Sequence, residues 1–159
     1  MNSYATHPST SLQPNPVLCP VIILVLWSFI MMIWLYATRI PATKRLNIQY
    51  DPRKHLASHF EAQMPPEARW VADNYNHLME QPTLFYAVAL TLALINDRNN
   101  FNLTLAWLYV LLRIVHSLIQ ATINRVMWRF FVFILGSTLL LILAIRIAAI
   151  LLFGGGNSI

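Results

Sequence analysis

The stretch VLCPVIILVLWSFIMMIWLYA, from Val17 to Ala37, decides the fold class of this chain. Its 21 residues carry no charge, and a helix of about 20 apolar residues crosses the ~30 Å hydrocarbon core of a bilayer at ~1.5 Å per residue. Pro16 and Pro20 stand at its start, where proline is tolerated because the first N–H groups of a helix have no intrahelical partner. The stretch therefore predicts a transmembrane helix.

The composition of the whole chain also indicates a membrane protein. The 159 residues are 57% hydrophobic and 11% charged, whereas soluble domains carry about 25% charged residues. Disordered chains are polar and poor in aromatic residues, so disorder is excluded. The single cysteine, Cys19, excludes an internal disulfide and a cysteine-based zinc site. We predict no metal site.

Three further segments are predicted to span the membrane, at about 71–95, 103–123 and 130–153. The second segment is polar in its first half, and Pro82 is expected to kink it or to be accommodated by neighbouring helices. A polar loop at 39–70, with a short helical turn around 55–62, joins the first two spans. We therefore predict an all-α integral membrane protein, a bundle of four transmembrane helices that forms one domain over residues 1–159.

The net charge is +5, but the basic residues lie mostly between the apolar segments, as membrane topology would place them, and do not form one patch. This distribution argues against nucleic-acid binding. The second connection between spans carries only Arg98 as a basic residue. The positive-inside rule places the first and third connections in the cytoplasm and both termini outside. The basic residues of those two connections are Arg39, Lys44, Arg45, Arg53, Lys54, Arg69, Arg125 and Arg129.

Two of the predicted helices carry polar faces. On the second helix, residues at i, i+3, i+4 and i+7 lie on one side, and they are Asp73, Asn76, His77 and Glu80. On the third helix, polar residues recur at steps of three and four, and they are Tyr109, Arg113, His116, Gln120 and Asn124. These faces either join the helices structurally or line a cavity, open to the cytosol, for a polar and partly anionic ligand.

Ionisable residues within the predicted spans are expected to find partners. The helical rise places Glu80 level with His116 and within side-chain reach of Arg113. A buried carboxylate without a cation is strongly penalised, so we predict a Glu80–Arg113 ion pair. Arg146, near the outer end of the fourth span, is expected to reach the outer surface or to meet Asp97.

Three polar motifs occur in a fixed order along the chain. They are DNYNHLMEQPTLFY at 73–86, Arg113-x-x-His116-Ser117, and Asn124-Arg125-Val126-x-x-Arg129-Phe130. With these motifs the sequence, over about residues 17–153, resembles the MAPEG family, the membrane-associated proteins in eicosanoid and glutathione metabolism, and in particular its bacterial branch. The resemblance implies a four-helix homotrimer that binds glutathione between neighbouring subunits near the cytosolic side. It also implies conjugation of glutathione to lipophilic electrophiles, or reduction of lipid peroxides.

The resemblance implies a role for individual residues. Glu80 matches the acid that accepts the amino group of glutathione, and Arg113 and Arg39 match arginines that hold carboxylates through paired N–H donors. Arg125 or Arg129 is the candidate to stabilise the thiolate, and the resemblance leaves both open. The remaining candidates to line the glutathione site are Arg69, Asn76, His77, Tyr109, His116 and Gln120.

Two positions depart from the family pattern. His77 stands three residues before Glu80, where the family has asparagine, and Asn76 lies one place earlier. Gln120 stands seven residues after Arg113, where a tyrosine is expected, although Tyr109 lies one turn before Arg113. Both departures touch the part of the motif that distinguishes the glutathione enzymes of the family.

The sequence therefore leaves three function classes open. The leading prediction is a glutathione- or thiol-dependent transferase or peroxidase of the bacterial inner membrane, in contact with membrane lipid and acting on a lipophilic small molecule. The second is a non-catalytic lipid-binding or accessory protein, which Gln120 favours. The third is a structural subunit of a larger membrane complex. A channel is disfavoured because four short spans with one ion pair show no pore-lining pattern.

Overall fold

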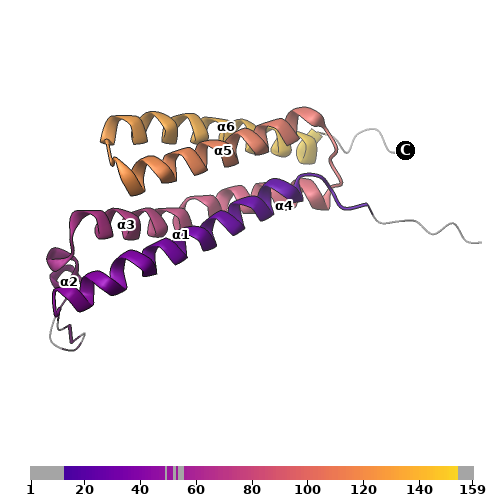
Figure 1. The fold of residues 1–159 in the computed structure, drawn as a ribbon. Coiled ribbons are helices and arrows are strands. Elements are labelled where there is room, and N and C mark those ends of the chain that lie inside the picture. The colour runs from indigo at the N-terminus through magenta and orange to yellow at the C-terminus, as the bar shows by residue number, and fades with distance from the viewer. Residues whose placement is uncertain (1–12, 49, 52, 54–55, 154–159) are drawn as a thin grey trace, which may run out of the picture.

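The computed structural model describes residues 13–48, 50–51, 53 and 56–153, and within them the chain is helical and contains no strand. The elements are α1 (Leu18–Arg45), α2 (Ala57–Gln63), α3 (Pro66–Glu80), α4 (Pro82–Leu94), α5 (Asn100–Thr122) and α6 (Val126–Phe153). Figure 1 shows α1 lying along α3 and α4, with α5 and α6 paired beside them. The all-helical prediction is confirmed for the described residues.

Helix α1 is longer than its apolar stretch. It starts after a turn in which the Asn15 side chain accepts a hydrogen bond from the Val17 N–H at 3.0 Å. It then continues past Ala37 to Arg45, through Pro41. Proline removes one hydrogen bond from a helix interior and its ring crowds the preceding turn, yet α1 continues through Pro41. The first part of the predicted 39–70 loop is therefore helical.

The second predicted span is divided into two helices at Gln81. Helix α3 ends at Glu80, and Pro82 is the first residue of α4. Because Pro82 has no N–H, the helical ladder is interrupted, and the Thr83 hydroxyl donates to the Glu80 carbonyl oxygen at 2.7 Å. The backbone of Gln81 is itself right-handed helical, so α4 continues directly from α3.

Helices α5 and α6 form a hairpin. The Asn99 side chain caps α5 by accepting the Phe101 N–H at 2.9 Å. Beyond the other end of α5, Asn124 has a φ of 49° and its N–H donates to the Ile119 carbonyl oxygen at 2.7 Å. Asparagine tolerates this left-handed conformation better than most residues, which permits the tight turn into α6.

Three of the described helices are long and apolar enough to cross a membrane, namely α1, α5 and α6. Helices α3 and α4, of 15 and 13 residues, are each too short to do so alone. Many large apolar side chains on α1 and α6 are exposed, among them Ile33 at 64% and Leu152 at 74%. Such surfaces are suited to lipid or to other transmembrane helices, so the chain is an integral membrane protein.

The basic and the weakly charged ends of the bundle lie apart. Figure 1 places α2 and the α5–α6 turn at one end, and the start of α1, the α4–α5 turn and the end of α6 at the other. The first end, called here the basic end, carries most of the described cations. They are Arg39, Lys44, Arg45, Arg53, Arg69, Arg125 and Arg129.

A network of hydrogen-bonded polar side chains connects the helices at the opposite end of the bundle. The Arg146 Nε donates to the Asn102 Oδ1 at 2.6 Å, and the Asn102 amide donates to the Asp97 carboxylate at 2.9 Å. The Asn15 amide in turn donates to the Asp97 carbonyl oxygen at 2.8 Å. The predicted meeting of Arg146 with Asp97 is therefore indirect, because the buried Asn102 lies between them and serves both.

Candidate functional site

The polar residues of α5 lie on its buried face. Tyr109, Arg113, His116 and Gln120 are between 0% and 5% exposed. Steps of three and four residues keep them on one side of the helix, toward α3 and α6. The face thus forms a polar strip inside the bundle.

Arg113 is held by uncharged partners. Its Nε donates to the Tyr109 Oη at 3.1 Å, and its Nη1 lies 3.4 Å from the His77 Nε2. The guanidinium carbon also lies 5.4 Å from the centre of the Phe133 ring. The Tyr109 hydroxyl in turn donates a hydrogen bond to the Gln81 Oε1 at 2.9 Å. Arg113 is 4% exposed, so it is a buried cation inside one subunit.

The predicted Glu80–Arg113 ion pair is wrong for a single subunit. Among the described residues, the only ion pair joins Arg39 and Glu61. Glu80 is exposed at the end of α3, whereas Leu78 is buried. Two residues turn a helix by about 200°, so a helix that buries Leu78 directs Glu80 away from the interior. Asp73 and Asn76 are exposed as well.

The contact between α3 and α5 uses a pair that the sequence analysis missed. The Asn74 amide donates to the Ser117 hydroxyl at 2.8 Å, and both side chains are at most 1% exposed. Gln81, whose amide also donates to the Ser137 hydroxyl at 3.2 Å, was missed too. The available signal was the alignment of Asn74, Leu78 and Gln81 at steps of four and three, on a face adjacent to that of Asp73, Asn76, His77 and Glu80.

His77 and His116 face each other, with ring centres 5.2 Å apart. The His116 Nδ1 lies 3.1 Å from the Arg129 carbonyl oxygen, and its Nε2 lies 3.2 Å from the Gln120 Oε1. A carbonyl oxygen only accepts hydrogen bonds, so Nδ1 of His116 carries a proton. This bond ties the start of α6 to α5.

A cavity of about 290 Å³ opens beside this histidine pair. Its wall combines two imidazoles, one guanidinium and apolar side chains, and the lining residues are His77, His116, Val126, Arg129, Phe130 and Phe133. The Arg129 Nη1 donates to the Asn124 Oδ1 at 2.5 Å, while its buried Nε has no partner among the described residues. The cavity therefore contains a cation with unused hydrogen-bonding capacity. It is called here the histidine cavity.

Arg125 belongs to a different place. It is exposed and lines a second cavity, of about 370 Å³, together with Ile119, Ile123 and Trp128. None of these residues lines the histidine cavity. The two arginines that the sequence left as alternatives therefore lie in separate surroundings.

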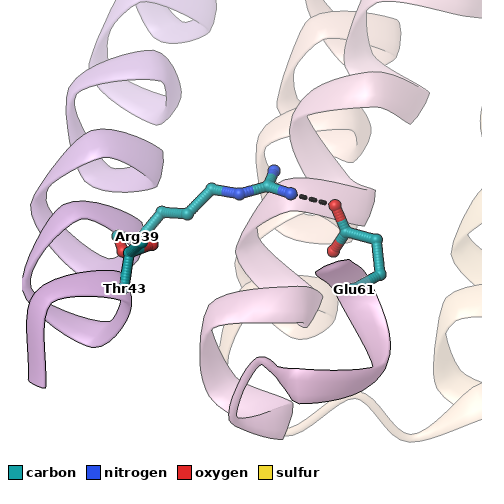
Figure 2. Close-up of polar contacts among 3 residues, drawn as sticks. All are labelled: Arg39, Thr43 and Glu61. Atoms are coloured by element: carbon teal, nitrogen blue, oxygen red, sulfur yellow. Dashed lines mark hydrogen bonds and ion pairs between the residues drawn. The ribbon is translucent and has the colours of Figure 1, made fainter. Parts of the chain in front are cut away.

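The other predicted site residues stand apart from the histidine cavity. Arg39 of α1 forms the ion pair with Glu61 of α2 (Figure 2). Its guanidinium carbon also lies 4.9 Å from the centre of the Phe60 ring. Arg69, in the first turns of α3, is half-buried, and its Nε has no partner among the described residues. Within the same part of the chain, no three histidine, cysteine or acidic residues are grouped to hold a metal ion.

One comparison with known proteins gives a match. The sequence model of the MAPEG family matches residues 17–149, which is most of the chain. No curated protein and no solved structure matches.

Proposed function

Since the chain belongs to the MAPEG family, we propose that it binds glutathione or a related low-molecular-weight thiol and transfers it to, or uses it to reduce, a lipophilic electrophile or peroxide. The family includes glutathione transferases and peroxidases, together with other members. The observation that carries the proposal is the histidine cavity, where the Arg129 guanidinium lies beside two imidazoles and an aromatic wall.

Arg129 is the residue we assign to the thiol sulfur. A guanidinium stays charged at any physiological pH, and a nearby positive charge favours a thiolate over a thiol. Arg129 lines the histidine cavity, and its buried Nε has no partner among the described residues. Arg125 lines the other cavity and is therefore the weaker of the two candidates.

The main requirement of the proposed reaction is the positive charge of Arg129, which stabilises the thiolate. The bound thiol releases its proton to water, and the sulfur lone pair then forms a bond to the electrophilic carbon while the electron pair of the broken bond leaves with the leaving group. Raising the thiolate population increases the rate of this attack. Val126, Phe130 and Phe133 give the same cavity an apolar wall, which suits the second, lipophilic substrate.

The ends of the thiol ligand need partners that one subunit does not gather around the cavity. Glu80 and Asn76 are exposed on α3, and Arg39 lies with α2. Polar side chains are costly on a lipid-exposed helix surface, which favours a second copy of the chain over this face. We therefore propose a homotrimer in which the ligand lies between subunits, with Glu80 accepting its ammonium group and Arg39 and Arg69 meeting its carboxylates.

The distribution of charge supports a proposal for the location and orientation of the protein. We propose the bacterial inner membrane, with the basic end of the bundle in the cytoplasm, where soluble thiols are present. The support is the concentration of arginines and lysines at that end.

The experiment is a glutathione titration of the detergent-purified protein, followed by thermal unfolding and by the ultraviolet absorbance of the thiolate. A ligand that binds only the folded state adds about 2.7 kcal/mol at a hundredfold excess over its Kd. We expect a saturable rise in Tm and a thiolate signal, and we expect Arg129→Gln to remove the signal while Arg45→Gln keeps it. If Arg125→Gln removes the signal instead, the assignment of the two arginines is reversed.

A second function is favoured by one specific contact. Gln120 is 2% exposed and interacts with His116, so an amide occupies the position where the resemblance expects a tyrosine hydroxyl. This arrangement suits a non-catalytic lipid-binding or accessory protein, or a structural subunit of a membrane complex. Saturable glutathione binding without turnover of any electrophile would support it, as would a Tm that is unchanged at millimolar glutathione.

A further inference from the structure

The second cavity, around Arg125, is not used by the proposed reaction. Its lining residues come from the last turn of α5, the α5–α6 turn and the first turn of α6, at the basic end of the bundle (Figure 1). We propose that this cavity binds the headgroup phosphate of an anionic phospholipid.

The charge in the cavity is unpaired. Arg125 is exposed, and its side chain makes no hydrogen bond or ion pair with any residue that the structure describes. A guanidinium presents several N–H donors in a plane and holds a phosphate through two of them. An anionic lipid headgroup supplies the opposite charge that this arginine lacks within its own subunit.

The rest of the wall suits the part of a lipid below its phosphate. Ile119 and Ile123 are aliphatic, and Trp128 is 62% exposed. Tryptophan is enriched at the level of lipid headgroups, because its ring is apolar and its N–H donates a hydrogen bond. The volume of about 370 Å³ admits a headgroup and the beginning of its chains. The remaining acyl length then lies along the apolar surface of the bundle.

The position of the cavity agrees with this ligand. Basic pockets beside transmembrane helices on the cytoplasmic side commonly bind anionic headgroups. Exposed apolar side chains continue from the cavity onto α6, including Met127 and Phe131, both more than 60% exposed. Arg125 thus lies at the edge of an apolar surface that suits the acyl chains of a lipid.

The proposal is independent of thiol binding. The lining of the Arg125 cavity shares no residue with that of the histidine cavity. Loss of glutathione binding would therefore leave the lipid site intact, and loss of the lipid would leave the thiolate signal at Arg129 intact.

The test is native mass spectrometry of the detergent-purified protein, titrated with phosphatidylglycerol or with phosphatidylcholine of the same acyl chains. We expect phosphatidylglycerol to form more adducts, and Arg125→Gln to reduce this preference about fivefold, the usual effect of one basic residue near an anionic surface. Trp128→Leu should reduce it as well. The matched control is Arg45→Gln, since Arg45 is another exposed arginine at the basic end.

Three outcomes would overturn the proposal. The first is equal binding of the two lipids by the native protein. The second is an Arg125→Gln variant that keeps the full preference of the native protein. The third is an Arg125→Gln variant with a smaller oligomer than the native protein and the Arg45→Gln control, which would show that a second copy of the chain covers the cavity.

Discussion

Arg39 of α1 and Glu61 of α2 form the only ion pair among the residues that the structure describes. Figure 2 shows the Arg39 guanidinium reaching across from α1 to the Glu61 carboxylate. The same guanidinium lies over the Phe60 ring, so both contacts attach α2 to the end of α1. The Glu61 carboxylate is thus paired with Arg39, the arginine that we propose binds a carboxylate of the thiol ligand.

Glu61→Gln is therefore expected to strengthen glutathione binding, because it removes the competing charge from Arg39. Partly exposed ion pairs contribute about 0–1 kcal/mol, so the Kd should fall by up to about fivefold. The Tm titration measures this change. Glu67→Gln, at an exposed position in the first turn of α3, is the matched control. A Kd that stays equal or rises in Glu61→Gln would show that the pair does not compete with ligand.

Tyr109→Phe is expected to destabilise the bundle. The change leaves the Arg113 Nε and the Gln81 Oε1 without their hydroxyl partner in a buried place, and such a loss costs about 1–3 kcal/mol. Thermal unfolding in detergent measures it. Tyr36→Phe serves as the control, since Tyr36 is an exposed tyrosine on α1. Equal Tm values for the two variants would contradict a structural role for the Tyr109 hydroxyl.

Asn102→Ala is expected to loosen the end of the bundle opposite the basic end. Asn102 accepts from the Arg146 Nε and donates to Asp97, so alanine leaves both ionisable groups short of a partner. We expect a loss of about 1–3 kcal/mol in unfolding free energy, against little change for Asn100→Ala at an exposed position. Hydrogen exchange of the α4–α5 turn should rise in the Asn102 variant alone.

Gly136→Ala is expected to be tolerated. Gly136 is buried in α6, and an added Cβ would meet the Leu112 Cβ at 3.8 Å, an ordinary van der Waals contact. Alanine also favours a helix over glycine by up to about 1 kcal/mol, so the Tm should stay equal or rise. Gly136→Leu is the contrast, since its longer side chain exceeds this space and should lower the Tm. A marked loss of stability in Gly136→Ala would indicate that another chain packs against this position.

Several features of the candidate site were predictable because they depend on local periodicity. The polar strip Tyr109, Arg113, His116 and Gln120 recurs at helical spacing, and the structure buries all four on one face of α5. Pro82 likewise marked the interruption between α3 and α4, because it has no N–H to donate to the preceding turn. The side chains that these residues contact could not be predicted from local periodicity.

The sequence by itself determined the membrane-spanning character of α1, α5 and α6, because hydropathy over about 20 residues is a local property. Only the tertiary structure decided that α3 turns Asn74 inward and Glu80 outward, and that Arg129 lines the histidine cavity while Arg125 does not. The first outcome depends on the rotation of α3 about its own axis, whereas the second arises because Arg125 lies in the turn before α6 and Arg129 lies in its first turn. That rotation is set by packing against neighbouring helices, and a shift of one residue turns a side chain by about 100°.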